Sequence, residues 1–257
     1  MSFTLAHPAA IIPLCRKNRY FHKIGLILGS MAPDFEYFLH LKPYATIGHN
    51  CLGFLIINLP LCFVIYYLYI NFIQYSFSLL AIENVKLISQ KTIAYSNFIK
   101  TNNKIVFLDK KSSLKIKVIN TIKFTLSALI GMFTHVFWDS FTHINGYFVK
   151  NIAMLNVKIL NRIPIYKVLQ HGGTIIGFSI IVFILYKIGF RIKLKKLKLN
   201  PKKIALSICI ALLIFLGFLI KADMHIANLV IIFCNTLFIM SVIIGYFYRK
   251  IIEKRLE

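Results

Sequence analysis

Long apolar runs without charge constrain this chain more than any other feature. A helix that crosses the hydrocarbon core of a bilayer needs about 20 mostly apolar residues. Five runs approach or reach that length, at residues 51–73, 118–143, 171–190, 204–220 and 226–248. Hydrophobic residues make up 58% of the chain and charged residues 15%, against about 25% charged residues in a soluble domain. The sequence therefore predicts an all-α, polytopic membrane protein with about five transmembrane helices, folded as a single helical domain over 1–257.

Basic residues gather between the apolar runs. The 31 Lys and Arg against 8 Asp and Glu give a formal net charge of +23, and most of this excess lies in 82–123, 187–203 and 249–257. Cytoplasmic loops of membrane proteins carry such an excess. We therefore expect basic cytoplasmic loops at 82–117 and 191–203, a cytoplasmic C-terminus, and contact with anionic lipids at the cytoplasmic face. These stretches contain no nucleic-acid recognition motif, so no nucleic-acid partner is predicted.

The first 50 residues contain two shorter apolar stretches, 8–15 and 24–33. A basic turn separates them, formed by Arg16, Lys17, Arg19 and Lys23. We interpret the two stretches as an N-terminal helical hairpin that is re-entrant or just long enough to span the bilayer, with its turn toward the cytoplasm. The ends of this hairpin, His7 and Asp34, would then face the other side. The alternative is a hairpin that lies in the membrane interface.

Three ionisable side chains share one face of the 118–143 run. His135, Asp139 and His143 follow one another at intervals of four residues. At about 100° per residue, each interval turns the side chain by only ~40° around the helix axis. Because an ionisable group at membrane depth costs about 3 kcal/mol or more, this face is predicted to have a functional role.

Further histidines and acids are predicted at the same end of the helices, outside the cytoplasm. They are His7, Asp34, Glu36, His49 and His171. Imidazole and carboxylate groups are the ligands of Zn²⁺ and similar divalent ions. The predicted metal ligands, with zinc as the expected ion, are His49, His135, Asp139, Asp34, His7, His143 and His171. Asp139 and Glu36 are the predicted catalytic carboxylates, one of them acting as the general base toward a metal-activated water. The five scattered cysteines form no C-x-x-C pair and predict no zinc framework of their own.

Five motifs in the first 180 residues resemble a bacterial membrane family, the domain of unknown function 4184. The motifs, in order, are FTLAHPAAIIPL, GSMAPDFEYF, GHNCLGFLIINLPL, HVFWDSFTHINGYF and IPIYKVLQHGGTIIG. The resemblance implies a multi-pass protein of the bacterial inner membrane. It implies no established activity.

A more distant resemblance is to the membrane-bound metal-dependent hydrolases. Their pattern has a His near the N-terminus, a Pro-Asp-x-Asp segment, a Thr-His-Ser segment and a His-x-x-x-Asp helix. The matching residues here are His7, Asp34 with Glu36, His49, and His135 with Asp139. Glu36 stands in place of the second Asp and keeps a carboxylate, whereas Asn50 stands in place of the Ser and removes a hydroxyl.

The resulting hypothesis is a membrane-bound metal-dependent hydrolase that acts on a lipid-linked or membrane-proximal ester or phosphoester at the extracytoplasmic face. Two alternatives stay open. An ion- or proton-coupled transporter would carry ionisable residues along its spans, whereas here they crowd one end. A non-enzymatic structural or assembly protein would use the same residues as a buried hydrogen-bond network.

Overall fold

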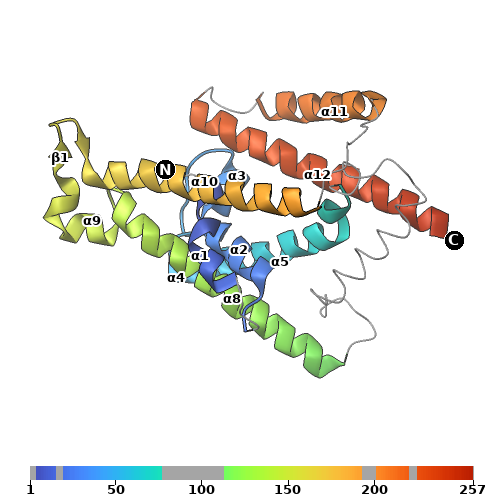
Figure 1. The fold of residues 1–257 in the computed structure, drawn as a ribbon, viewed down its shortest axis with the longest axis horizontal. Helices are drawn as coiled ribbons and strands as arrows, with labels where there is room; N and C mark the ends of the chain where they lie inside the picture. The colour runs from blue at the N-terminus through green and yellow to red at the C-terminus, as the bar shows by residue number, and fades with distance from the viewer. Residues whose placement is uncertain (1–3, 16–19, 77–112, 193–200, 220–224, 257) are drawn as a thin grey trace. The chain divides into compact units, whose positions relative to one another are not determined.

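The structure is a computed structural model that describes residues 4–15, 20–76, 113–192, 201–219 and 225–256. The regular secondary structure of these residues is helical apart from one short hairpin (Figure 1). The helices are α1 (Pro8–Cys15), α2 (Lys23–Met31), α3 (Phe35–His40), α4 (Cys51–Gly53), α5 (Leu59–Leu68), α8 (Leu114–Thr142), α9 (Tyr147–Asn151), α10 (Ile165–Ile192), α11 (Pro201–Leu219) and α12 (Ile226–Leu256). The hairpin pairs β1 (Lys158–Ile159) with β2 (Ile163–Pro164) in antiparallel orientation. The predicted all-α class is confirmed.

Four helical stretches among the described residues are long and apolar enough to cross a membrane. They are Cys51–Ser76, Leu114–Asn151, Ile165–Lys187 and Ile226–Lys250. The fifth predicted span coincides with α11, whose described apolar part, Cys209–Leu219, is shorter than a span. Length and hydropathy thus support a multi-pass membrane protein that contacts the lipid bilayer.

Two helices begin earlier than the apolar runs predicted. α8 takes in residues 114–117, which were assigned to a basic loop, and α10 begins at Ile165 rather than near 171. Pro164 explains the second start, because proline is favoured where a helix begins and its missing N–H costs nothing there. The remainder of the two predicted basic loops, at 82–112 and 193–200, lies outside the described residues.

The chain divides into two compact units, and the residues of interest all belong to the first. The first unit contains described residues from 1–36, 45–62 and 118–192, and the second those from 37–44, 63–117 and 193–257. Within the first unit, α1 packs against both α2 and α10. The N-terminal hairpin stays a prediction, because its turn at 16–19 lies outside the described residues.

The core of the first unit is a very close crossing of α2 and α8. A Cβ atom added at Gly29 would lie 2.1 Å from the carbonyl oxygen of Ala128, and one at Gly131 would lie 2.5 Å from that of Leu26. Only glycine permits two helix backbones to approach this far, which is a common device in membrane helix packing. The serine hydroxyl of Ser127 further accepts a hydrogen bond from the backbone N–H of His22 at 2.8 Å. The crossing places the end of α2 against the second half of α8.

The second unit is built on α12. It packs on α11 and on the π-helical turn Tyr69–Ile73. A Cβ at Gly245 would lie 2.0 Å from the carbonyl oxygen of Phe72, and Arg249 donates from Nη1 to Asn71 Oδ1 at 2.9 Å. Close backbone approach and an interhelical polar contact therefore stabilise this unit as well.

The α2–α8 crossing predicts different effects for the same substitution at two glycines. Gly29→Ala would push a methyl group into the Ala128 backbone, and we expect a loss of about 1–3 kcal/mol in the free energy of unfolding. Gly172→Ala in α10 meets nothing within 4 Å and gains helix propensity of about 0.5–1 kcal/mol. Thermal unfolding of both variants in detergent measures the difference. Equal melting temperatures for the two variants would contradict the close crossing.

Candidate metal centre

Asp34 lies in a tight turn between two helices. The 3₁₀ turn Ala32–Asp34 follows α2 directly, and Pro33 near its start favours the turn. The carboxylate is 3% exposed. Thr4 donates its hydroxyl hydrogen to Asp34 Oδ2 at 2.6 Å, so Oδ2 is occupied and Oδ1 is the oxygen that faces the histidines.

His49 belongs to a loop that Glu36 holds in place. Both oxygens of the Glu36 carboxylate accept hydrogen bonds from this loop: Oε1 from the N–H of Thr46 at 2.8 Å and from its hydroxyl, and Oε2 from the N–H of Gly48 at 2.9 Å. Asn58 donates to the carbonyl oxygen of Gly48 at 2.6 Å. The backbone immediately before His49 is thereby fixed from two sides.

Asn50 ends this loop and starts the next helix. Its Oδ1 accepts a hydrogen bond from the N–H of Gly53 at 2.8 Å, which is the usual role of an N-cap residue. Serine could provide the same cap. The departure at position 50 is therefore explained locally, because Asn50 sets where the helix after His49 begins.

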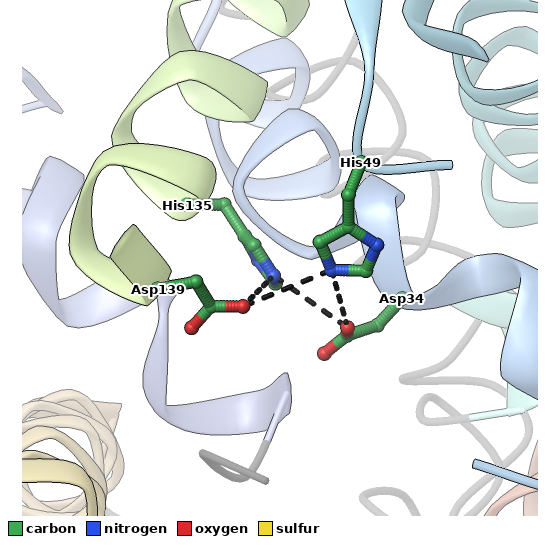
Figure 2. A group of neighbouring side chains, drawn as sticks. All are labelled: Asp34, His49, His135 and Asp139. Carbon is green, nitrogen blue, oxygen red and sulfur yellow. Dashed lines mark ion pairs between the residues drawn. The ribbon is translucent and has the colours of Figure 1, made fainter. Parts of the chain in front are cut away.

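His135 and Asp139 lie one turn apart on the buried face of α8, as their spacing predicted. His135 is 1% exposed and Asp139 is 9% exposed. The carbonyl oxygen of Ser30 lies 2.7 Å from His135 Nδ1. A carbonyl can only accept, so Nδ1 carries a hydrogen, and in the neutral imidazole Nε2 then presents its lone pair. His135 Nε2 is buried without a hydrogen-bond partner, and it points at the two carboxylates (Figure 2).

The four side chains alternate around a common centre (Figure 2). His135 Nε2 lies 3.5 Å from Asp34 Oδ1 and 3.2 Å from Asp139 Oδ2. His49 Nε2 lies 3.4 Å and 3.7 Å from the same two oxygens. All four atoms lie within 4.8 Å of one another. Each imidazole nitrogen therefore faces one oxygen of each carboxylate.

These spacings match a metal site better than a set of direct hydrogen bonds. A charge-assisted N–H···O bond is about 2.7–2.9 Å long, and all four distances exceed that. Four ligands bound tetrahedrally at about 2.0–2.1 Å from Zn²⁺ lie about 3.3–3.4 Å from each other. The four N···O distances scatter around this value, while the four atoms as a set spread over up to 4.8 Å. The group could therefore hold a metal ion once its side chains close by about 1 Å around it.

His7 and His143 flank the other oxygen of Asp139. His7 Nε2 lies 3.7 Å and His143 Nδ1 lies 3.4 Å from Asp139 Oδ1. The His7 ring also stacks on His135 with 3.7 Å between the ring centroids, and His143 Nε2 lies 3.3 Å from Gln170 Nε2. Asp139 thus uses Oδ2 toward the centre and Oδ1 toward two histidines that surround it.

The structure separates two of the predicted residues from this group. His171 is exposed on α10. That helix begins at Ile165, six residues before the predicted start, so His171 does not lie at its head. Glu36 lies close in sequence to Asp34, but its carboxylate is used on the 46–48 loop. Glu36 therefore positions the loop that carries His49 and is not one of the four side chains that could hold a metal ion.

Several polar partners of the site had no signal in the sequence. Thr4 contacts Asp34 and Gln170 contacts His143 through their side chains, and Ser30 contacts His135 through its backbone carbonyl oxygen. Polar groups of these kinds occur throughout any chain. Only the fold brings them to the site. Thr4 is the second residue of the motif FTLAHPAAIIPL, but no spacing pattern marks its hydroxyl as a partner of Asp34.

The charges around Asp34 and His49 favour a positive charge between the two carboxylates of the site. Burial alone would raise the pKa of Asp34, but the imidazoles of His135 and His49 and the Thr4 hydroxyl hold it well below its usual range. Burial alone would lower the pKa of His49, but the carboxylates of Asp139 and Asp34 raise it to about 9. The carboxylates thus need positive charge beside them, which either protonated imidazoles or a metal ion can supply.

The Glu36 contacts predict a local effect of removing its charge. Glu36→Gln keeps the shape of the side chain but replaces one acceptor oxygen by an NH₂ group that faces backbone donors. We expect a loss of about 1–3 kcal/mol in the free energy of unfolding, since buried donors lose their partner, and faster amide hydrogen exchange at 46–48. Thr46→Val, which removes one hydroxyl donor, should cost less. Unchanged exchange at 46–48 in Glu36→Gln would contradict this role.

Comparison with known proteins gives one match. The family model of a domain of unknown function, DUF4184, matches residues 1–248. No curated protein and no solved structure matches the chain. The matched region includes every residue of the candidate metal centre and nearly the whole length of the chain. The family expected from the five sequence motifs is confirmed: the chain belongs to the DUF4184 family.

Proposed function

We propose that this protein is a membrane-bound metal-dependent hydrolase. Its metal ligands are Asp34 Oδ1, His49 Nε2, His135 Nε2 and Asp139 Oδ2. The observation that carries the proposal is the set of four N···O distances of 3.2–3.7 Å, which alternate between imidazole and carboxylate around one centre. Zinc is the expected ion, because two imidazoles and two carboxylates are ligands that it prefers.

The surroundings of the ligands support a preorganised site. Ser30 fixes the tautomer of His135, Thr4 holds the second oxygen of Asp34, and Glu36 fixes the loop of His49. Such outer partners orient metal ligands and typically contribute 10–100-fold to metal affinity or activity. A buried polar network without a metal needs its hydrogen bonds satisfied, whereas His135 Nε2 has no hydrogen-bond partner.

The side chains of the site differ in their exposure. The side chain of His49 is 31% exposed and that of His143 is 32% exposed, while those of His135 and Asp34 are almost fully buried. A substrate would therefore approach past His49 and His143. A divalent ion that accepts a fifth ligand beside these four would polarise a carbonyl or phosphoryl oxygen, or lower the pKa of a water molecule. Asp139 and His143 are the groups placed to accept and pass on a proton, in place of Glu36.

The position along α8 supports a membrane-proximal substrate. His135 lies seven residues before the end of α8 at Thr142, which is about 10 Å along the helix axis. The site is thus near one end of a membrane-length helix, where a lipid headgroup or lipid-linked ester lies. We place this end at the extracytoplasmic face, because the basic stretches of the sequence lie toward the opposite ends of the apolar runs.

Metal content tests the proposed ligands first. Detergent-purified wild type should carry about one zinc-like ion per chain, because the four ligands form one site. His135→Ala and Asp139→Asn should each weaken binding by more than the ~10–100-fold that loss of an outer partner costs. His225→Ala, at an exposed position outside the site, is the matched control and should keep the ion. Elemental analysis of fractions from the folded size-exclusion peak measures all four proteins.

Turnover then tests the reaction class. The metal-loaded protein in nanodiscs is assayed with bis(p-nitrophenyl) phosphate as the phosphoester probe and p-nitrophenyl butyrate as the ester probe. We expect metal-dependent release of p-nitrophenol from one probe, lost in Asp139→Asn. Activity that survives Asp139→Asn would contradict the site. A folded wild type that takes up no metal would contradict the metal proposal itself and favour the buried ion-pair network.

A further inference from the structure

The segment that joins α8 to α10 exposes apolar side chains although it is well folded. Residues 144–164, here called the connecting segment, contain α9, the 3₁₀ turn Ala153–Asn156 and the β1–β2 hairpin. They lie at the left of Figure 1, where the ends of α8 and α10 meet. The apolar side chains exposed on this segment are Ile144, Tyr147, Ile152, Met154, Val157, Ile159, Leu160 and Ile163.

A small internal core already stabilises this segment. Val149, Leu155 and Tyr166 are buried together, and side chains from the adjoining ends of α8 and α10 pack around them. The exposed apolar side chains are therefore a second set that points away from this core. Exposed apolar side chains in this number, outside the stretches that cross the bilayer, mark a surface that contacts a membrane or a partner.

The hairpin holds its apolar tip in a fixed orientation. Ile159 and Ile163 are directly paired across the two strands, so their side chains lie on the same face. Leu160 lies between them in the turn, directly after Ile159, with a φ angle of 51°, and is 87% exposed. A leucine in the left-handed region is uncommon and costs about 1–2 kcal/mol. The turn nevertheless presents its most apolar residue outward.

The same segment is basic and has no acid. Lys150, Lys158 and Arg162 are exposed on it, and Lys167 follows on the first turns of α10. No Asp or Glu occurs between residues 140 and 222 of the sequence. Basic residues beside exposed apolar residues are the pattern of a surface that lies in the headgroup region of an anionic membrane.

The flanking helices place the segment at the membrane surface. The stretches Leu114–Asn151 and Ile165–Lys187 are both long and apolar enough to cross the bilayer. The part of the connecting segment between them, 152–164, which holds the β1–β2 hairpin, therefore emerges at one interface. We propose that the β1–β2 tip inserts Leu160, Ile159 and Ile163 into that leaflet while Arg162 and Lys158 bind anionic lipid headgroups. The inference stands on this surface and does not depend on the metal proposal.

Such insertion would fix the depth of the first unit in the bilayer. The connecting segment is continuous with α8, which carries His135 and Asp139, and with α10, which carries Gln170. A hairpin anchored in the leaflet would hold the candidate metal centre close to the headgroup level. The occupant of this surface is thus the membrane itself, rather than a protein partner.

Tryptophan fluorescence tests the insertion directly. The chain has a single Trp, Trp138, so the full-length variants Leu160→Trp and Ile159→Trp each add one reporter to a measured wild-type baseline. The proteins are placed in nanodiscs of phosphatidylcholine, with or without phosphatidylglycerol, and in matching nanodiscs of dibrominated lipid. We expect a blue-shifted added emission that brominated lipid quenches and aqueous iodide does not.

A second pair of variants at Arg162 tests the proposed contact with anionic headgroups. In the Leu160→Trp background, Arg162→Glu should abolish the increase in lipid quenching that phosphatidylglycerol produces, whereas Arg162→Lys should keep it. Equal quenching with and without phosphatidylglycerol would overturn the anionic headgroup contact. Added emission at the aqueous wavelength with strong iodide quenching would overturn insertion. A blue shift that neither quencher affects would overturn it as well, because protein would then cover the tip.

Discussion

Two buried carboxylates that face each other across a small space are the constraint on which the rest of the first unit depends. Asp34 and Asp139 are almost removed from water, and a buried charge is costly unless positive charge and hydrogen bonds compensate it. His49 and His135 lie between the two carboxylates, and Thr4, His7 and His143 surround their outer oxygens. A divalent ion at the centre would neutralise both carboxylates at once.

The helix crossing makes this arrangement possible. Gly29 and Gly131 let the backbones of α2 and α8 come together, and the next residue of α2, Ser30, then reaches the His135 ring with its carbonyl oxygen. One turn later the chain leaves α2 and delivers Asp34 to the same place. The absence of side chains at the two glycines therefore explains both the close packing of α2 on α8 and the contact that orients the His135 ring.

The sequence predicted what depends on local periodicity and hydropathy. The shared face of His135 and Asp139 follows from helical spacing, and the apolar runs predicted the membrane helices. His171 and Glu36, which the structure places apart from the group of four, differ from the prediction for reasons that are also local. The first turns of α10 are polar, so the apolar run began later than the helix does, and His171 was predicted at the head of the helix. Glu36 follows Asp34 by two residues, over which a helical chain turns by about 200°, so its side chain points away from that of Asp34. The contacts of Thr4 and Ser30 arise only from tertiary packing.

X-ray absorption at the zinc edge of the zinc-loaded protein tests the central claim most directly, because it measures the ligand set without an assay. The account predicts only nitrogen and oxygen neighbours at about 2.0–2.1 Å, with the outer-shell scattering of two imidazole rings and no sulfur. A sulfur neighbour at about 2.3 Å would assign the metal to the scattered cysteines. Oxygen neighbours without imidazole scattering would show that His49 and His135 do not bind it.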